Sequence, residues 1–436
     1  MMKRMRILPS RAGLAFKQRA RLSSLARAIQ SDRSFKLDGK LVSMLSPSEK
    51  QALLEQVPRP GSRVVVGMSG GVDSSVSAAI LSELGCYDVT GCWMKNWDLQ
   101  DEAPTKVAVC SQEKDWEDAS QVAQMLDIPI VQKDFCKDYW CSVWEPCLRE
   151  YSTGRTPNPD ILCNREIKFG AFLASLVDEG VEFVATGHYA RLSAKERYLL
   201  RGLDPLKDQS YFLSSVLPSA FQKACFPVGF LHKSKVKALA AAAGFHSVVT
   251  KPESQGVCFI GERGSQFSRF LEEYVENRPG RFIDAESGKD MGLHRGSLNY
   301  TIGQRARVAG KNQPYFVARK IGDDVVIAPG HNHPAVAADF VVARFESRLV
   351  EENSLDDHQD DRFSLDCQVR YRAAPSKCSL RMMTRPDDGV ATYLRVSFER
   401  DEFGVAEGQT LALYDGERCL GGGEIVEVHR PFFDKV

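Results

Sequence analysis

Residues 64–75 read VVVGMSGGVDSS, and this stretch is the strongest indication of fold and chemistry in the chain. Its three valines predict a short buried strand, and its glycines permit a tight turn after that strand. Residues 76–84 then carry apolar side chains at helical spacing. A turn between a strand and a helix N-terminus favours anions, because backbone N–H groups and the helix dipole both face it. The stretch therefore predicts a phosphate-binding loop.

The loop is not of the Walker A type, because the pattern Gly-x-x-x-x-Gly-Lys-Ser/Thr is absent. The letters SGGVDS at 69–74 resemble instead the pyrophosphate loop of enzymes that cleave ATP between the α and β phosphates. Such enzymes adenylate a carbonyl oxygen and release pyrophosphate. ATP is therefore the expected cofactor, and an ordinary glycine-rich turn is the competing interpretation.

Length and composition limit the other possibilities. A chain of 436 residues is expected to hold two or three domains. Its formal net charge is zero, so any RNA site must be a local patch, and no apolar run reaches the ~20 residues that span a bilayer. The twelve cysteines include no Cys-x-x-Cys pair, which argues against a zinc ribbon or a thioredoxin-type motif. We expect no membrane association, and a reducing compartment.

The N-terminal segment has a composition of its own. Residues 1–31 carry eight Lys or Arg and no acidic residue, with serines and small apolar residues between them. This is typical of an organellar transit peptide, and the continuous apolar core of a secretory signal is absent. A disordered basic arm is the alternative, and a plastid address has the same composition. Residues 32–60 are predicted to be a linker.

From residue 61 to about 262, predicted strands and helices alternate. Strands are expected at 89–94, 128–131 and 181–186, with helices between them, so we predict an α/β domain with a doubly wound parallel sheet. Ligands bind beyond the carboxyl ends of such strands, where both the 69–75 loop and the Thr-Gly-His-Tyr run at 186–189 would lie. The histidine of that run suits either an RNA or phosphate contact or a structural role.

Two segments carry cysteines in chemically suggestive surroundings. In the first, 154–168, Asp160 is predicted to cap a helix and Cys163 to lie in its first turn, where the helix dipole and basic neighbours favour a thiolate. Asp160 is also close enough to act as a general acid or base. In the second, 252–261, Cys258 lies in a glycine-containing loop that a partner could reach. For each cysteine alone, a buried structural role is the competing interpretation.

Taken together, these segments resemble the tRNA-specific 2-thiouridylase family. The Pro-Asn-Pro-Asp-x-x-Cys run is the most specific feature, and the resemblance covers about residues 62–430. The basic arm is an addition that points to the mitochondrial branch and hence to the matrix. Ala306 is a departure, because the family usually has a lysine there. The segments that carry the resemblance are 67–75, 156–168, 186–189, 207–213, 254–261, 300–305 and 419–425.

The resemblance implies a reaction. The C2 oxygen of the wobble uridine of a tRNA is replaced by sulfur, and it must first become an ester of AMP because oxide is a poor leaving group. Cys258 would carry a persulfide received from a sulfur-donor protein, Cys163 would be the partnering nucleophile, and Asp160 the acid or base. The two thiols would end as a disulfide. No protein-bound catalytic metal is implied, but Mg²⁺ should neutralise the pyrophosphate.

The resemblance also assigns binding residues. The target base must be splayed out of the anticodon loop to be reached. Burial in a barrel core is the competing interpretation for Tyr371. The residues implied for ATP are Gly67, Met68, Ser69, Gly70, Gly71, Val72, Asp73, Ser74, Met94 and Gly187. Those implied for tRNA are Asn158, Pro159, Asp160, His188, Lys207, Asp208, Gln209, Arg370, Tyr371 and Gln409.

The C-terminal third has a different pattern. Short strands separated by turns predict a small central module at 263–330 and a β-barrel at 337–431. By the resemblance, both would hold tRNA. Two other functions stay open at this point: another adenylating synthetase acting on a small substrate, and an RNA-binding protein without catalytic activity.

Overall fold

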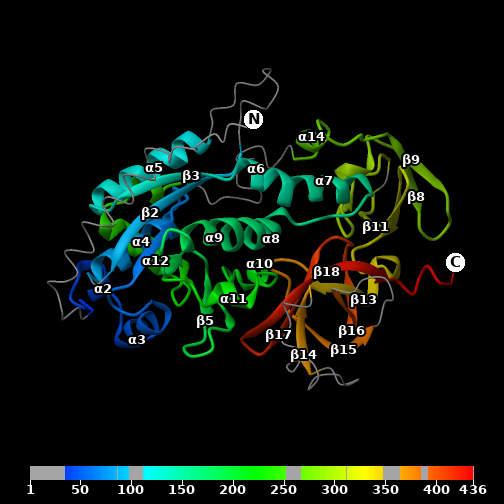
Figure 1. The fold of residues 1–436 in the computed structure, drawn as a ribbon. Coiled ribbons are helices and arrows are strands. Elements are labelled where there is room, and N and C mark those ends of the chain that lie inside the picture. Colours follow the sequence, from blue (N-terminus) through cyan, green and yellow to red (C-terminus); the bar gives the residue numbers. More distant parts are fainter. Residues whose placement is uncertain are drawn as a thin grey trace, which may run out of the picture.

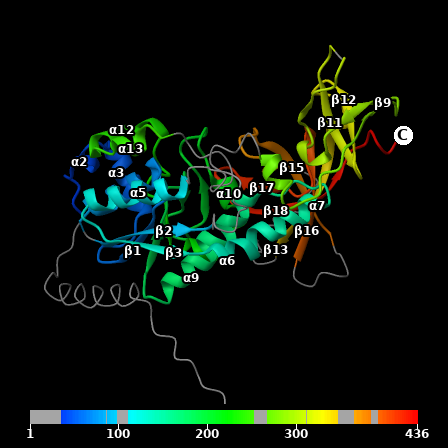
Figure 2. The ribbon, with the colours of Figure 1, turned by 90° about the horizontal axis from the view of Figure 1, so that it is seen from above.

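The computed structural model describes residues 35–85, 87–97, 111–251, 267–310, 312–346, 364–383 and 391–435. The 1–31 arm and the segment around Cys258 lie outside these residues. Three sheets organise the described chain into an α/β domain, a central module and a barrel (Figure 1). Seen from above, the α/β domain lies at one end, and the other two lie together at the opposite end (Figure 2). Within the described residues, no helix has both the length and the apolar character to cross a membrane.

The first sheet confirms the predicted doubly wound fold. Its strands pair in the order β3-β2-β1-β4-β7, and every pairing is parallel. The order reverses beside β1, where ligands bind in open α/β sheets. The strands are β1 (Arg63–Gly67), β2 (Asp88–Lys95), β3 (Ile130–Asp134), β4 (Phe183–Ala185) and β7 (Ala224–Cys225).

The valine run packs on both faces of this sheet. Val64 and Val66 belong to one core and Val65 to the other, because successive side chains of a strand point to opposite faces. The first core also contains helices α4 (Val72–Glu83), α5 (Ser111–Met125), α12 (Lys233–Ala243) and α13 (His246–Val249). A strand buried on both faces needs a continuous apolar run, which the sequence provides.

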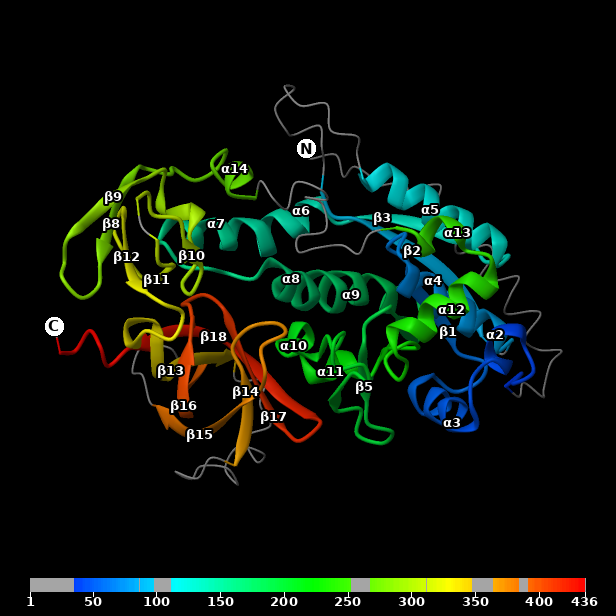
Figure 3. The same ribbon diagram turned by 180° about the vertical axis from the view of Figure 1, so that it is seen from behind.

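The second face is covered by two rows of helices that run toward the other domains (Figure 3). Both rows contain π-helical turns. Such turns are rare in proteins overall, and those that occur often lie at functional sites. One row is α6 (Cys136–Tyr139), η2 (Trp140–Trp144) and α7 (Glu145–Ser152). The other is α8 (Pro159–Leu162), η3 (Cys163–Ala171) and α9 (Phe172–Val177).

The predicted linker at 32–60 is described from residue 35 and is not a linker there. It forms α2 (Lys40–Ser43) and α3 (Pro47–Gln56), whose apolar side chains enter the first core. Glu83, in the last turn of α4, accepts hydrogen bonds from the backbone N–H groups of Leu41 (2.8 Å) and Val42 (3.0 Å). This carboxylate therefore satisfies helix N-terminal donors that α2 cannot satisfy itself.

The C-terminal part confirms the predicted barrel. Strand β13 pairs with both β16 and β18, so the sheet closes on itself. The barrel strands are β13 (Ala337–Glu346), β14 (Leu365–Gln368), β15 (Ser376–Met383), β16 (Ala391–Phe403), β17 (Thr410–Asp415) and β18 (Arg418–His429). The central module has α14 (Phe267–Leu271), β8 (Gly280–Asp284), β9 (Asp290–His294), η5 (Ser297–Asn299), β10 (Arg305–Ala306), β11 (Tyr315–Ile321), β12 (Asp324–Pro329) and η6 (Pro334–Val336).

A hairpin of the first domain extends the barrel sheet. Strands β5 (Ala190–Leu192) and β6 (Leu199–Arg201) pair with each other, and Leu200 of β6 pairs with Arg418 of β18. Two short helices, α10 (Ser210–Leu213) and α11 (Pro218–Phe221), follow this hairpin. The Tyr211 hydroxyl of α10 donates to the Thr410 carbonyl of the barrel at 2.9 Å. The α/β domain and the barrel are thus joined by backbone and side-chain hydrogen bonds.

The contact between Glu83 and α2 gives the first testable prediction. Glu83→Ala leaves the N–H groups of Leu41 and Val42 without their acceptor, and we expect a loss of about 1–3 kcal/mol in the free energy of unfolding. Amide hydrogen exchange of residues 40–56 should rise. The control is Glu55→Ala on the exposed side of α3, where Glu55 accepts from Gln51 and from no other residue that the structure describes. Equal protection of 40–56 in both variants would contradict the role of Glu83.

Candidate active site

The predicted phosphate loop lies at the carboxyl end of β1 and is closed by serine hydroxyls. The Ser74 Oγ accepts from the Ser69 N–H at 3.2 Å and donates to the Gly71 carbonyl at 3.1 Å. Gly70 has a φ of +70°, a left-handed conformation that glycine adopts without a steric penalty. Gly71 is the N-cap of α4, and no side chain caps this helix among the described residues. The first amides of α4 therefore face the loop, as anion binding requires.

Gly187 and Met94, which are predicted to bind ATP and lie outside the loop in the sequence, both lie beside it in the structure. A β-carbon at Gly187 would lie 2.6 Å from the Ser74 nitrogen, so glycine is needed there because the loop itself approaches. Met94 lies beside Gly67, with its Cε 3.7 Å from the position of a β-carbon there. The Met68 side chain points into the core, so Met68 offers only its backbone.

The Asp73 carboxylate is held by two residues that the sequence did not single out as partners. Lys233 donates from Nζ to both carboxylate oxygens at 2.7 Å, and the Tyr189 hydroxyl donates to Oδ1 at 2.7 Å. Lys233 is almost fully buried at the start of α12. Tyr189 belonged to a recognised segment, but no sequence pattern connects Lys233 to the loop.

A second lysine was also missed. Lys251 donates from Nζ to the Gly70 carbonyl at 3.1 Å, and it pairs with Asp115 (2.5 Å) and Asp118 (2.7 Å) of α5. Burial alone would lower the pKa of Lys251, but the hydrogen bonds and charges of the two aspartates raise it. Lys251 therefore bridges two carboxylates beside the loop, offsets part of their charge and holds the Gly70 peptide. The acidic residues of α5 were the only sequence signal for this contact.

The Cys163 segment differs from its prediction in two respects. The N-cap of α8 is Asn158, whose Oδ1 accepts from the Asp160 N–H at 3.2 Å, and Pro159 is the first helical residue. Asp160 is thus inside the helix and is not the cap. Cys163 follows the single turn of α8 and begins the π-helical segment η3, so it is not in the first turn. Its side chain is buried in the second core.

Asp160 and His188 lie in environments that shift their protonation. Burial of the Asp160 carboxyl raises its pKa, and the charge of Lys168 partly opposes this shift. Burial holds the pKa of His188 well below its usual value, and Lys168 lowers it further. The Cys163 helix and the 186–189 turn are in contact, because the ring of Phe169 in η3 lies 5.9 Å from the ring of His188. His188 is neutral, its Nδ1 lies 2.7 Å from the Thr186 Oγ1, and its ring packs on Phe169 and Phe226.

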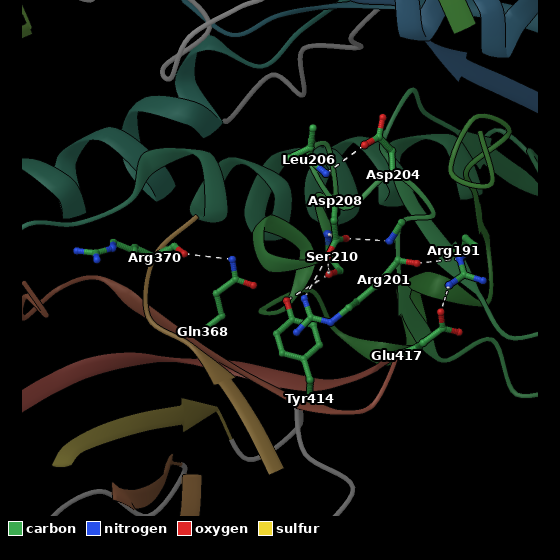
Figure 4. Close-up of polar contacts among 11 residues, drawn as sticks. Arg191, Arg201, Asp204, Leu206, Asp208, Ser210, Gln368, Arg370, Tyr414 and Glu417 are labelled. Atoms are coloured by element: carbon green, nitrogen blue, oxygen red, sulfur yellow. Dashed lines mark hydrogen bonds and ion pairs between the residues drawn. The ribbon is translucent and has the colours of Figure 1, made fainter. Parts of the chain in front are cut away.

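The Lys207–Gln209 turn, predicted to contact tRNA, lies at the junction of the α/β domain and the barrel (Figure 4). Asp208 accepts from the Gly202 N–H at 2.8 Å, from the Ser210 N–H and Oγ at 3.0 Å, and from Arg201 at 3.3 Å. Gln209 accepts from the Tyr189 N–H at 2.9 Å. The carboxylate and this amide thus have structural partners in the described chain.

Arginine and tyrosine side chains complete this junction. The Arg201 guanidinium lies 3.5 Å from the centre of the Tyr414 ring, and Ser210 Oγ lies 3.2 Å from the Tyr414 hydroxyl. Arg191 pairs with Glu417 at 2.9 Å (Figure 4). Asp208 therefore positions Arg201 and Ser210, which in turn contact the barrel.

The remaining tRNA-predicted residues lie between the Cys163 helix and the barrel. The Gln409 Nε2 donates to the Thr156 carbonyl at 2.6 Å, next to the Asn158 cap. The Tyr371 ring packs on Phe212 with ring centres 4.4 Å apart, against the second core and not inside the barrel. The Arg370 side chain is exposed, and its carbonyl accepts from Gln368 at 3.2 Å.

Comparisons with known proteins agree with this architecture. Family models described as tRNA methyl transferase HUP domain, tRNA methyl transferase PRC-barrel domain and Aminomethyltransferase beta-barrel domain match residues 62–262, 268–328 and 347–425. A relative from Shouchella clausii named tRNA-specific 2-thiouridylase MnmA is 39% identical, covering 85% of this chain and 98% of the relative. One of the same name from Streptococcus sanguinis is 40% identical, covering 84% and 96%.

The chain belongs to the tRNA-specific 2-thiouridylase family. A solved U34-tRNA thiolase from Methanococcus maripaludis is 17% identical and covers 52% of this chain and 72% of its own. Its TM-score of 0.33 is too low to support an inference. The second cysteine that the family resemblance implies, Cys258, lies outside the described residues.

The described residues of this family member contain no cluster suited to a resident metal. No group of three His, Cys, Asp or Glu side chains lies together in the part of the chain that the structure covers. Asp73, the acidic residue in the phosphate loop, is already bound by Lys233 and Tyr189. The loop therefore does not fit a protein-held Mg²⁺, and any Mg²⁺ would have to arrive with the phosphates of its substrate.

Lys251 gives a prediction for this site. Lys251→Met would leave Asp115 and Asp118 unpaired beside the loop and release the Gly70 carbonyl. We expect kcat/KM for ATP to fall about tenfold or more, because hydrogen bonds to charged groups contribute about 1.5–3 kcal/mol. Pyrophosphate release at varied ATP concentrations measures the effect, with Lys237→Met, at an exposed position of α12, as the control. Asp115→Asn with Asp118→Asn should restore part of the loss, and an unchanged kcat/KM for ATP in Lys251→Met would refute the role.

Proposed function

We propose that this protein is a tRNA 2-thiouridylase that adenylates the C2 oxygen of a wobble uridine and replaces it with sulfur. The products would be 2-thiouridine, AMP and pyrophosphate. The observation that carries the proposal is the meeting of two features at one sheet edge. A loop with uncapped helix amides faces the switch point beside β1. The helix of Cys163 reaches the same region, since Phe169 of η3 packs on His188, in the turn whose Gly187 lies against the loop. Relatives of the same name, matched over nearly their whole length, support it.

In the first step of the proposed reaction, the amides at the start of α4 bind the phosphates. The uridine C2 oxygen attacks the α phosphorus, the bond to the bridging oxygen breaks, and pyrophosphate leaves. Lys233 pairs with Asp73, and Lys251 pairs with Asp115 and Asp118, so each of the three aspartates near the loop has a cationic partner when the polyanion binds. This arrangement is electrostatic preorganisation, which costs no rearrangement at the moment of reaction.

In the second step, the terminal sulfur of a Cys258 persulfide attacks C2 and AMP leaves. The Cys163 thiolate then attacks the Cys258 sulfur, which forms a Cys163–Cys258 disulfide and releases the thiolated base. Asp160 takes the Cys163 proton, and its burial-raised pKa brings its proton affinity closer to that of a thiol. A disulfide requires Cα atoms about 4.4–6.8 Å apart, so the Cys258 segment must approach Cys163. A thiol reductant must supply two electrons before the next turnover.

Two partners complete the proposal. The persulfide is supplied by a sulfur-donor protein, since sulfur must arrive already at the oxidation level of a persulfide. Mg²⁺ accompanies ATP as part of the substrate, held by the phosphates. The tRNA lies between the Cys163 helix and the barrel, where Asn158, Tyr371 and Gln409 are found.

The test of this function uses the two cysteines. Wild-type protein, ATP, a persulfide source and tRNA should give 2-thiouridine, detected by mass spectrometry of the nucleosides. Cys163→Ser and Cys258→Ser should each abolish 2-thiouridine and still bind ATP, because the thiols act after nucleotide binding. Single turnover without reductant should leave a Cys163–Cys258 disulfide on non-reducing peptide mapping.

One control variant and two possible outcomes complete this test. Cys141→Ser changes an exposed cysteine on η2 and should leave thiolation unchanged. Full activity in either serine variant of the proposed pair would refute the relay. Pyrophosphate release with a small substrate and without tRNA would assign the protein to another class of adenylating synthetase.

We also propose that the protein acts in the mitochondrial matrix. The support is the composition of residues 1–31, with eight basic residues and no acidic one. Removing these residues should leave thiolation in vitro unchanged and prevent import into isolated mitochondria. A variant with serine in place of the eight Lys and Arg tests charge separately from length. Import of the truncated protein would overturn the transit-peptide interpretation.

A further inference from the structure

The turn at 202–209, between β6 and α10, contains a buried carboxylate that the proposed reaction does not use. Asp204 is only 8% exposed, although aspartate is rarely this buried unless its oxygens are paired or hydrogen-bonded. Its Oδ1 accepts from the Leu206 N–H at 3.1 Å (Figure 4), and its Oδ2 accepts from the Lys233 N–H at 3.0 Å. The second of these bonds connects the turn to a residue of the phosphate-loop region.

Asp204 supplies the start of α12 with an acceptor that this helix lacks. The N-cap residue is His232, whose side chain makes no capping hydrogen bond, and Lys233 is the first helical residue. The first N–H groups of a helix have no partner within it, and the helix dipole favours a carboxylate at that end. Asp204 therefore fixes the backbone of Lys233 from 29 residues away in the sequence.

The side chain of Lys233 carries this constraint to Asp73. Its Nζ donates to both carboxylate oxygens of Asp73 at 2.7 Å, and the lysine is 9% exposed. In a close-packed interior, a shift of the Lys233 backbone is not absorbed by a free change of rotamer. The bond from Asp204 to the Lys233 N–H thus helps to determine where the ammonium group lies.

The other end of the same turn holds the second partner of Asp73. The Gln209 Oε1 accepts from the Tyr189 N–H at 2.9 Å, and the Gln209 N–H donates to the Tyr189 carbonyl at 2.8 Å. Tyr189 is 2% exposed, and its hydroxyl donates to the Asp73 Oδ1 at 2.7 Å. One turn therefore fixes the backbones of both residues that bind the Asp73 carboxylate.

The position of Asp73 explains why these contacts matter for the nucleotide. Asp73 lies in the first turn of α4, whose amides face the phosphate loop. Without a well-placed ammonium group, its carboxylate would repel the phosphates of ATP, and charges interact more strongly in a partly buried site than in water. A side chain that only stabilised the fold would change the unfolding temperature and leave the affinity for ATP as it was.

We propose that Asp204 and Gln209 are positioning residues for ATP, which act on its phosphates by holding Lys233 and Tyr189 against Asp73. The proposal rests on the proposed function, which places ATP at this loop. Neither side chain has to touch the nucleotide. Their contribution is to set the charge and the orientation of Asp73 before ATP binds, which is preorganisation.

The experiment measures ATP binding alone. The full chain is titrated calorimetrically with ATP and Mg²⁺ and without RNA, so that a contact of Gln209 with tRNA cannot contribute. We expect Asp204→Ala and Gln209→Met each to raise the Kd for ATP about tenfold, and Asp204→Asn, which keeps one acceptor oxygen, to raise it less. The thermal unfolding midpoint of each variant is measured in parallel.

The matched control is an aspartate with the same kind of contacts elsewhere in the chain. Asp284 of the central module is 9% exposed and accepts from the N–H groups of Glu286 at 3.2 Å and Ser287 at 2.9 Å. Asp284→Ala should lower the unfolding midpoint and leave the Kd for ATP at the wild-type value. This control separates the loss of a buried turn from an effect on the phosphate loop.

Double variants then test the route of the effect. In a Lys233→Met background, Asp204→Ala should raise the Kd for ATP little further, because the ammonium group through which it acts is gone. In a Tyr189→Phe background, Gln209→Met should likewise add little, because the hydroxyl bond to Asp73 is gone. Both cycles use the Kd for ATP without RNA.

Two results would overturn the proposal. One is an unchanged Kd for ATP in Asp204→Ala and Gln209→Met together with lowered unfolding midpoints, which would leave these side chains a structural role only. The other is full additivity with Lys233→Met and Tyr189→Phe, which would exclude these two residues as the route. Failure of the proposed function is a separate result, since the protein would then show this pattern of ATP binding and form no 2-thiouridine with tRNA and a persulfide source.

Discussion

The carboxylate of Asp73 must be neutralised before the phosphate loop can accept a polyanion. Lys233 supplies the opposite charge and Tyr189 adds a hydrogen bond, from two separate elements, α12 and the turn after β4. The same turn brings Gly187 against the backbone of Ser74, at a distance that no larger residue permits. The loop conformation is thus fixed by contacts from segments more than 100 residues away, and these contacts determine where the amides of α4 point. Binding of phosphate by preset amides needs no rearrangement of the loop.

The position of the barrel depends on this arrangement through a second set of contacts. Gln209 bonds to the backbone of Tyr189, and the adjacent Asp208 organises Arg201 and Ser210 against Tyr414. A residue that looks like a polar surface contact in the sequence is therefore a connector between domains. Substituting Asp208 would weaken tRNA binding by moving the barrel, even without a direct contact to RNA. A loss of binding in such a variant is thus poor evidence that Asp208 touches tRNA.

Sequence patterns predicted the elements that depend on local composition. The valine run, the glycine turn and the alternation of strands and helices specified the parallel sheet, and the short turn-separated strands specified the barrel. The two helices at 40–56 were missed because their polar faces resemble a linker and their burial depends on Glu83, far along the chain. The N-cap of α8 was predicted at Asp160, because Asp and Asn both suit an N-cap position. The structure has Asn158 there, with Pro159 as the first helical residue. Lys233 and Lys251 were missed because ion pairs between distant elements leave no periodic signal.

The burial of Cys163 and of the Asp160 carboxyl suits the chemistry proposed here. An adenylated uridine is an activated ester, and water would hydrolyse it back to uridine and AMP. A site that excludes water protects this intermediate, and the same exclusion raises the pKa of the Asp160 carboxyl, which makes its carboxylate a stronger base. Asp160 is therefore suited to exchange a proton with a thiol inside a dry site. The π-helical start at Cys163 widens the helix at the point where the thiol is placed. The apolar surroundings of Cys163 would be a disadvantage for a thiol that had to meet a protein donor, so the delivery of sulfur is better assigned to a second cysteine on another segment.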